Sequence, residues 1–507
     1  MIQAVSSADT ERFRAVIARR LGLHFDDAKL GMLADVLRRR VGAARHSAGA
    51  YLAGMEAESW HHEIGALAQE LTVPETYFFR NPDQFRAFAE IALPDRSSVQ
   101  NGGRHLRILS AGCATGEESY SLGILVRDAL DPSWDVSILG VDINPAALHR
   151  ATHGRYSAWA LRETKREVQQ RWFKADGREF VLDQTLRSLV SFELRNLAQD
   201  DAQLWQPDGY DIVFFRNVLM YFTQAQGQAV IARIARALKP GGYLFLGHAE
   251  TLRGLSGDFH LQHTHETFYY QRKDHRAPSA VLPTSGASWR RLDPSSLDAA
   301  DGTDSWIETI RRATARIETL TDSARPSAAL AAATPRAARA TWDLALALDL
   351  LREERFTEAS ELVRRLPPES GRDPGVLLLN AALVTHGGQF AEAEHACRRL
   401  LDVDEMSAGA HYLLALCREG ARDRLGAAYH DQVAVYLDPV FAMPRLHLGL
   451  LARRAGDRAG AQRALEEALP LLQREDASRL LLFGGGFSRE ALIALCRTEL
   501  AGCGGSR

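Results

Sequence analysis

Cysteine is scarce in this chain, with five residues among 507, and no two of them stand in CxxC spacing. Neither a disulfide framework nor a zinc site is indicated, and a reducing compartment is expected. Charge of one sign is not in excess, because the formal net charge of −3 gives no global basic field for nucleic acid. No apolar run is long enough to span a bilayer and the first residues lack an apolar signal region, so the sequence predicts an unexported, cytoplasmic protein.

The length and the apolar content indicate several folded units. A chain of 507 residues with 46% hydrophobic residues can fill two or three cores. Residues 1–92 have helical periodicity, as in "AKLGMLADVLRRRVGAA", and predict a small helical domain. Residues 93–273 alternate strand-like and helical segments, which predicts a doubly wound, mostly parallel, Rossmann-like α/β sheet. The strand-like runs are residues 107–112, 136–143, 210–217 and 242–250.

The last third of the chain repeats itself. Two sets of small residues recur every 34 residues, namely Ala359, Ala393, Ala427 and Ala461, and Ala347, Ala381, Ala415 and Gly449. This is the period of tetratricopeptide repeats, so we expect an α-solenoid of four repeats over 340–475, followed by a tail over 476–507. The preceding residues 274–339 are rich in Ala, Pro, Ser and Arg and are predicted to be a linker. By analogy with other solenoids, the repeats are expected to bind a partner on a concave surface.

The stretch "ILSAGCATGEESYSL" (108–122) is the first candidate for a binding site. Its glycines, Gly112 and Gly116, follow a strand and let the backbone close on a ligand. Glu117 and Glu118 stand where a phosphate-binding loop carries Lys and Ser or Thr, and these carboxylates would repel a phosphate. A ligand with positive groups and no phosphate, such as S-adenosylmethionine, fits the turn better.

Two further strand ends supply candidate residues. Asp142 ends the next strand, where a carboxylate can accept both ribose hydroxyl protons of an adenosyl group; alternatively it caps the helix that "DINPAAL" begins. In "YDIVFFRNVLMYF" (210–222), the amide of Asn217 could reach the ligand and Tyr221 could flank the transferred methyl group. The alternative is a strand end with a satisfied asparagine and a core tyrosine. His248 and Glu250, after the last strand, are expected to be structural.

Four motifs together resemble the chemotaxis receptor methyltransferases of the CheR type. They are "ELTVPETYFFRNPDQF" (70–85), "SAGCATGEESYSL" (110–122), "FFRNVLMYF" (214–222) and "LFLGHAE" (244–250). The resemblance covers about residues 1–273. It implies a helical N-terminal domain and a catalytic domain with a small β subdomain, which uses S-adenosylmethionine to methylate glutamate side chains of chemoreceptors and releases S-adenosylhomocysteine.

Site residues follow from the resemblance by motif position. The implied cofactor-binding residues, besides Gly112, are Thr76, Arg80, Glu117, Asp142, Asn196, Leu197, Asn217 and Val218. Pro74 stands where relatives often have asparagine, which removes one polar contact. A glutamate carboxylate is already ionised at neutral pH, so methyl transfer needs alignment more than a strong base. Arg80 is therefore expected to orient carboxylates and Tyr221 to flank the methyl group as the catalytic residues.

Delivery to the receptor is predicted from three features. Arg38, Arg39 and Arg45 of "LRRRVGAARH" (37–46) could dock a glutamate-bearing receptor helix, unless they form only a solvated stripe. Within 172–194, the single glycine Gly177 argues against a turn that captures a receptor-tail pentapeptide as an added strand. The repeat-bearing form resembles the Wsp-type branch of the family, which controls surface attachment and biofilm formation.

Two other readings stay open on sequence alone. One is a small-molecule or nucleic-acid methyltransferase, although no (N/D)PP(Y/F) sequence follows the fourth strand. The other is a repeat scaffold whose methyltransferase domain only senses the cofactor.

Overall fold

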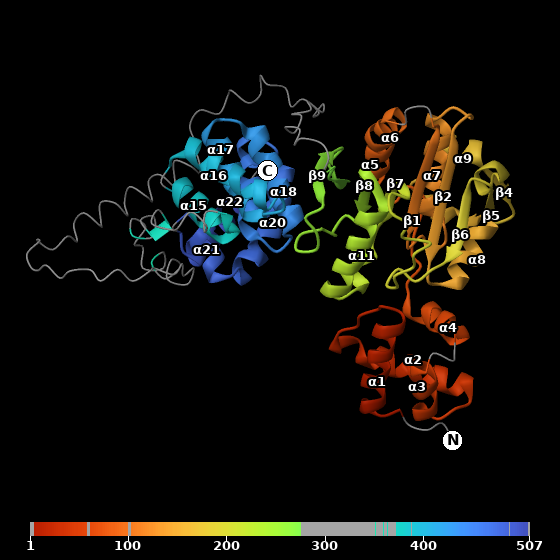
Figure 1. The fold of residues 1–507 in the computed structure, drawn as a ribbon. Helices are drawn as coiled ribbons and strands as arrows, with labels where there is room; N and C mark the ends of the chain where they lie inside the picture. Colours follow the sequence, from red (N-terminus) through yellow and green to blue (C-terminus); the bar gives the residue numbers. More distant parts are fainter. Residues whose placement is uncertain are drawn as a thin grey trace, which may run out of the picture. The chain divides into compact units, whose positions relative to one another are not determined.

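The computed structural model describes residues 5–57, 61–99, 103–274, 372–386, 388–485 and 487–504, with the single positions 350, 358, 362 and 363. The chain divides into two compact units, Met1–Ser285 and Gly286–Arg507 (Figure 1). The predicted linker, apart from residue 274, lies outside the described residues. Among the helices of the described ranges, none is long and apolar enough to cross a membrane.

The first unit begins with a small helical lobe. Its helices are α1 (Ser7–Arg20), η1 (Asp27–Lys29), α2 (Leu30–Ala44), α3 (Ala48–Glu56) and α4 (His61–Leu71). Helix α1 starts at a capping box, in which Ser6 and Asp9 each accept the other's backbone N–H. Fully buried side chains, including Phe13, Leu33 and Tyr51, give the lobe its own hydrophobic cluster. The predicted N-terminal helices are therefore confirmed.

A seven-stranded sheet forms the centre of the same unit, in the order β6-β2-β1-β7-β8-β10-β9. The strands are β1 (His105–Ala111), β2 (Asp135–Asp142), β6 (Val190–Leu194), β7 (Tyr210–Phe215), β8 (Leu238–Leu246), β9 (Phe259–Thr264) and β10 (Thr267–Arg272). The first five strands of that order pair in parallel, and the β9–β10 hairpin adds antiparallel strands beside β8. The strand order reverses at β1, between β2 and β7, where doubly wound sheets bind ligands.

The remaining helical segments of this unit precede or connect the strands. They are α5 (Pro82–Ala87), η2 (Phe88–Ala92), α6 (Leu93–Val99), α7 (Glu117–Ala129), α8 (Pro145–His153), η3 (Ala158–Leu161), α9 (Arg166–Trp172), α10 (Gln184–Arg187), η4 (Leu219–Tyr221) and α11 (Gln224–Ala237). Phe85 and Phe88 pack against Phe214 of β7, with ring centroids 5.8 and 5.6 Å apart. Residues from Phe78 onward thus belong to the cluster under the sheet, and the boundary in packing lies between the end of α4 and Phe78. The sequence predicted this boundary at residue 92, because residues 82–92 have the same helical period as the lobe before them.

A second, antiparallel sheet forms the small subdomain that the resemblance implied. Its order is β3-β5-β4, from β3 (Arg155–Ser157), β4 (Phe173–Asp176) and β5 (Glu179–Leu182). Gly177 lies in the β4–β5 turn with φ +64° and open space around its Cα. Residues 190–194, which the sequence grouped with this subdomain, pair instead with β2 of the main sheet.

The second unit consists of stacked helical hairpins. Its helices are α15 (Pro374–His386), α16 (Phe390–Val403), α17 (Ala408–Gly420), α18 (Arg424–Leu437), α19 (Ala442–Arg454), α20 (Arg458–Arg474), α21 (Ala477–Phe483) and α22 (Arg489–Gly504). The 34-residue period marks close helix contacts, since a Cβ on Gly449 would lie 2.6 Å from Leu465. Three hairpins of the predicted solenoid are present here. Ala347 and Ala359 of the first predicted repeat lie outside the described residues.

Candidate active site

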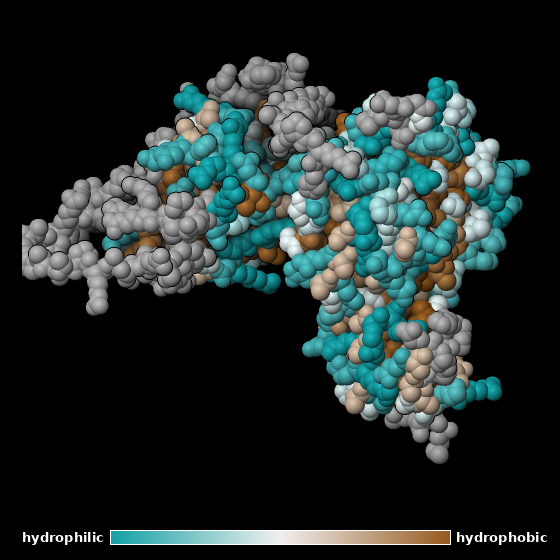
Figure 2. All heavy atoms as spheres, viewed as in Figure 1, coloured by the Kyte–Doolittle hydropathy of each residue, from teal (hydrophilic) through white to brown (hydrophobic). Residues whose placement is uncertain are grey.

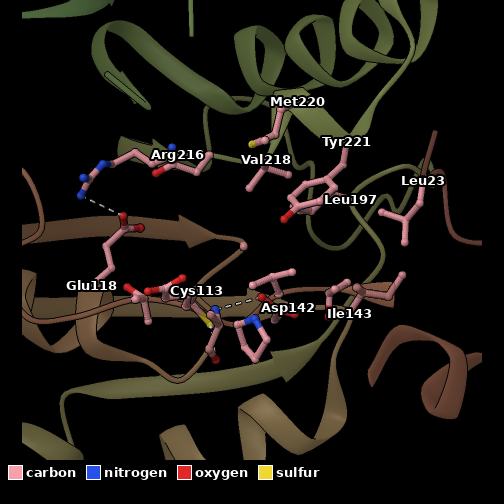
Figure 3. A pocket seen from close by; sticks show the side chains of 18 of the residues that line it. Leu23, Cys113, Glu118, Asp142, Ile143, Leu197, Arg216, Val218, Met220 and Tyr221 are labelled. Carbon is pink, nitrogen blue, oxygen red and sulfur yellow. Dashed lines mark hydrogen bonds and ion pairs between the residues drawn. The ribbon is translucent and has the colours of Figure 1, made fainter. Parts of the chain in front are cut away.

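A cavity of about 360 Å³ opens beyond the carboxyl ends of the parallel strands, at the reversal of strand order. Its walls come from the residues that follow β1, β2, β6 and β7, and from residues 72–80 between the two lobes. Figure 3 shows Asp142, Leu197, Val218 and Tyr221 around the cavity, with Glu118 and Arg216 side by side at one end. The volume lies in the range of small-molecule and cofactor sites.

The glycine turn lies directly at this cavity. Gly112 has φ +80°, and a Cβ there would stand 2.4 Å from a methyl group of Val218. Both facts require glycine, because an L side chain would be strained and would clash. Gly116, with φ +91°, is the N-cap of α7. The turn therefore brings bare backbone against the loop that follows β7.

Asp142 ends β2 at the same place. Its carboxylate accepts the backbone N–H of Ala114 at 2.9 Å and that of Asn144 at 2.8 Å. Helix α8 is capped by Asn144, whose side chain accepts the N–H groups of Ala146 and Ala147. Asp142 is thus not the helix cap, and its carboxylate retains lone pairs for a ligand. Burial raises the pKa of Asp142, and the hydrogen bonds from these backbone donors oppose that rise.

The two glutamates that follow Gly116 point in different directions. Glu117 is buried and accepts the hydroxyl of Thr115 at 2.6 Å, away from the cavity. Glu118 lines the cavity and accepts the hydroxyl of Ser110 at 2.8 Å. The structure therefore places Glu118, and not the predicted Glu117, at the site. Adjacent residues in the first turn of a helix diverge by about 100°, so motif position alone did not decide between them.

Glu118 forms a buried ion pair with Arg216, which follows β7. Arg216 Nη1 lies 3.2 Å from Glu118 Oε2, and the two side chains are 2% and 14% exposed. Arg216 Nη2 also donates to the backbone oxygen of Arg80 at 2.6 Å. Burial raises the pKa of Glu118, which the nearby Arg216 charge counteracts. The pair fixes residue 80 of the linking segment against strand β7.

The loop after β7 is held by one buried carboxylate. Glu250 Oε2 accepts the N–H groups of Asn217 and Gly247, each at 2.8 Å. Asn217 has φ +59°, in the left-handed region that asparagine tolerates. Tyr221, at the end of this loop, lines the cavity, and burial raises the pKa of its hydroxyl. Glu250 is structural, as predicted.

The N-terminal lobe closes one side of the cavity. Leu21 and Leu23 line it, and the backbone N–H of His24 donates to the oxygen of Tyr221 at 2.7 Å. Asn196 Nδ2 donates to the oxygen of Arg20 at 2.9 Å, so this amide joins the two lobes. The sequence analysis did not identify Leu21 or Leu23, because apolar residues between two helices read as ordinary core.

Most predicted site residues meet at this one cavity. Those that line it are Thr76, Arg80, Gly112, Asp142, Asn196, Leu197, Asn217, Val218 and Tyr221. Glu118 and Arg216 were visible in the motifs without being assigned to the site. Exposed Met220, at 71%, also lines it and carried no recognisable signal.

The predicted basic helix carries charges that are largely neutralised within the lobe. Arg38 pairs with Asp35 at 2.6 Å and Arg39 with Glu70 at 2.8 Å, while the less exposed Arg40 pairs with Glu63 at 2.7 Å. Arg45 is exposed at the left-handed C-cap of α2 and does not lie on the helix itself. The side of the lobe visible in Figure 2 is mostly hydrophilic. Arg38, Arg39 and Arg40 therefore form ion pairs with carboxylates of α2 and α4, and the docking of a receptor helix by this segment stays a prediction.

The charged side chains at the cavity fit a ligand that carries both positive and negative groups. Carboxylates of Glu118 and Asp142 and the guanidinium of Arg80 line one cavity, so ammonium, hydroxyl and carboxylate groups can each find a partner. The glycine turn gives close backbone approach, and the other two arginines that line the cavity, Arg195 and Arg216, are ion-paired with Asp201 and Glu118. S-adenosylmethionine has these groups and lacks phosphate.

Several known proteins are similar to this chain. Residues 74–268 match the family model described as CheR methyltransferase, SAM binding domain. The probable biofilm formation methyltransferase WspC of Pseudomonas putida is 30% identical over 461 residues, which cover 90% of this chain and 97% of that protein. Chemotaxis protein methyltransferase 2 of Vibrio cholerae is 30% identical over 54% of this chain and 96% of its own. A crystal structure of MamA protein aligns with 32% of this chain and 89% of its own, at 19% identity and a TM-score of 0.23.

Proposed function

This chain belongs to the CheR methyltransferase family. We propose that it methylates glutamate side chains of a methyl-accepting chemoreceptor, and that it does so at the cavity between the N-terminal helical lobe and the seven-stranded sheet. The observation that carries the proposal is the convergence of Thr76, Asp142, Asn196 and Asn217, from four separate segments, on one cavity. A generic methyltransferase shares only the glycine turn and the acidic strand end.

S-adenosylmethionine, when bound, supplies a methyl group on a positively charged sulfur. Asp142 would accept the ribose hydroxyls, and Asn196, Leu197, Asn217 and Val218 would enclose the adenosyl group. Glu118 is suited to the ammonium group of the methionine portion and Arg80 to its carboxylate. The product that leaves the cavity would be S-adenosylhomocysteine.

The remaining work of the chain is orientation. A substrate glutamate is ionised at neutral pH and needs no base. Arg80 and Tyr221 would hold its carboxylate in line with the methyl group, and the hydrophobic rim of Val73 and Met220, 69% and 71% exposed, would contact the receptor helix. Arg38, Arg39 and Arg45 would add weak, salt-sensitive attraction, because Arg38 and Arg39 are already paired within the lobe.

The wider setting follows from the relatives that span both units. Similarity to WspC over most of the chain supports a cytoplasmic role in a chemosensory system that controls surface attachment and biofilm formation. The C-terminal helical hairpins would recruit a signalling partner, and no receptor-tail pentapeptide would be captured at Gly177. A chain that ends at residue 273 should then bind the cofactor but methylate poorly in cells.

The test uses the purified full chain, radiolabelled S-adenosylmethionine and membranes from its own host. The proposal expects label in a chemoreceptor-sized protein as a base-labile ester. Base-stable label, or label in nucleic acid or small molecules, would overturn it. Cofactor binding with no transfer to any host fraction would indicate a sensing scaffold instead.

A further inference from the structure

The face made by the first helices of the three C-terminal hairpins is covered by the tail of the same chain. Helix α21 lies against α15, α17 and α19. Tyr412 of α17 donates its hydroxyl to the oxygen of Phe483, and the ring of His386 lies 2.7 Å from the oxygen of Leu482. A Cβ on Gly409 would stand 2.8 Å from the Phe483 ring. Helix α21 of the same chain therefore occupies a surface that repeat arrays offer to partners.

Phe483 and Arg479 of α21 contact Phe441, while Leu481 and Leu482 pack against Leu379 and Leu383 of α15. Phe483 is 4% exposed, and its ring centroid lies 5.0 Å from that of Phe441 and 6.0 Å from that of Tyr412. Arg479 lies over Phe441 at 4.5 Å and pairs with Asp438 at 2.6 Å. Phe441 therefore contacts both an arginine and an aromatic ring that stand four residues apart on one face of a helix.

Helix α21 is not needed to close the end of the array. Helix α22 already covers α20, where the Cys496 thiol donates to the oxygen of Leu465 and Glu499 pairs with Arg453 of α19. Helix α21 lies between α20 and α22 along the chain, and α22 packs against α20. A seven-residue helix is too short to be stable alone and depends on the face that it contacts. Its release would leave the α20–α22 packing in place.

We propose that this face is a docking site for a partner helix that carries a basic residue and, four positions later, an aromatic residue, and that α21 occupies it in the absence of that partner. Asp438 supplies the acidic partner for the basic residue, and Phe441, Tyr412 and Gly409 supply the pocket for the ring. Recognition is of the helix-in-groove type. The proposal is independent of methyl transfer.

The test uses a fluorescent peptide with the sequence of residues 475–485 and the full-length chain. We expect the substitution Phe483→Ala to release α21 from the face. The chain that carries it should then bind the peptide at least tenfold more tightly than the wild-type chain does. Peptides in which the phenylalanine is replaced by alanine, or the arginine by glutamate, should bind at least tenfold more weakly. Arg463→Ala, which alters an exposed arginine of α20, is the matched control and should behave as wild type.

Arg479→Ala is a second variant that should release α21, and it leaves the apolar contacts of the helix in place. If Phe483→Ala unfolds the C-terminal unit, the peptide affinity of Arg479→Ala is the one that tests the proposal. Equal peptide affinity for wild-type, Phe483→Ala and Arg479→Ala chains would overturn the proposal. Light scattering on the same samples tests for exchange of tails between two copies. A dimer of the opened variants would assign the face to a second copy of this chain and would also contradict the proposal.

Discussion

Glu118 on α7 and Arg216 after β7 form a buried ion pair at the wall of the cavity, with 3.2 Å between Oε2 and Nη1. The pair joins the glycine turn to the loop that carries Asn217 and Tyr221. It also reaches the segment before α5, because Arg216 donates to the oxygen of Arg80. Three parts of the site are thus held by one interaction.

Removal of one partner of this pair should be costly. Arg216→Met leaves the Glu118 carboxylate buried without its cation, and we expect the free energy of unfolding to fall by roughly 3–5 kcal/mol. Chemical denaturation of the full chain measures it. The double variant Arg216→Met/Glu118→Gln removes the stranded charge and should recover part of the loss; no recovery would show that the packing of Arg216, rather than the charge, matters.

Asp142 should control cofactor affinity. Asp142→Ala removes an acceptor worth about 1.5–3 kcal/mol per charge-assisted hydrogen bond, so affinity for S-adenosylmethionine should fall at least tenfold by calorimetry. Asp135→Ala, at the exposed opposite end of the same strand, is the control. Unchanged affinity in Asp142→Ala would mean that ribose is bound elsewhere.

Gly112 should tolerate no side chain, for two separable reasons. Gly112→Ala adds the cost of a positive φ and a contact of 2.4 Å between the new Cβ and Val218. Gly177→Ala adds only the cost of the positive φ, because no atom lies within 4 Å of a Cβ at that position. We expect Gly177→Ala to cost about 1–2 kcal/mol of stability and Gly112→Ala clearly more. Val218→Ala should rescue part of the Gly112→Ala loss in a double-mutant cycle, and additive losses would contradict the contact.

Tyr221 should matter for turnover more than for folding. Its backbone is held by His24, and its side chain lines the cavity and packs against the core of the N-terminal lobe, so Tyr221→Ala should keep cofactor affinity at a small cost in melting temperature. The loss of alignment should lower the rate of methyl transfer about a hundredfold. Tyr221→Phe separates the ring from the hydroxyl. Full activity in both variants would remove Tyr221 from the catalytic residues.

The C-terminal unit should lose stability as the pH rises above neutrality. His447 is buried between Asp431 at 2.7 Å and Glu419 at 3.0 Å, and these carboxylates raise its pKa from 6.5 to about 10 despite burial. Between these two values only the folded state holds the proton, so the free energy of unfolding falls with pH, by up to about 1.4 kcal/mol per pH unit. Below 6.5 both states are protonated and the His447 contribution is complete.

Calorimetric unfolding of the full chain between about pH 7 and about pH 9 checks this dependence. His447→Gln should flatten the response of the C-terminal transition, and His395→Gln, which alters an exposed histidine of α16, should leave it unchanged. A C-terminal transition that does not move with pH in the wild-type chain would contradict a protonated His447.

The sequence predicted features that depend on local pattern. The four strand-like runs match β1, β2, β7 and β8 because buried parallel strands are continuous apolar segments. The 34-residue period located Ala393, Ala427 and Ala461, all fully buried, because small residues are needed where helices touch. The β9–β10 hairpin was missed, since its histidines and polar residues obscure the alternation.

The features that the sequence did not predict depend on contacts between distant residues. The partners of Arg39 and Arg40 are Glu70 and Glu63, which lie on another helix. The cover of α15, α17 and α19 by α21 depends on a turn after α20 that no pattern marks. The expected binding of a partner on a concave surface of the repeats stays a prediction, to which the structure adds that α21 lies on this face.

The central claim is methylation of receptor glutamates by the cavity that Asp142 and Tyr221 line. The most direct measurement is tandem mass spectrometry of chemoreceptors from host cells that carry either the wild-type enzyme or Asp142→Ala at equal abundance. The account predicts the mass of one added methylene group on specific receptor glutamates in wild-type cells and its loss in the variant. Equal methylation of those glutamates in both strains would contradict it.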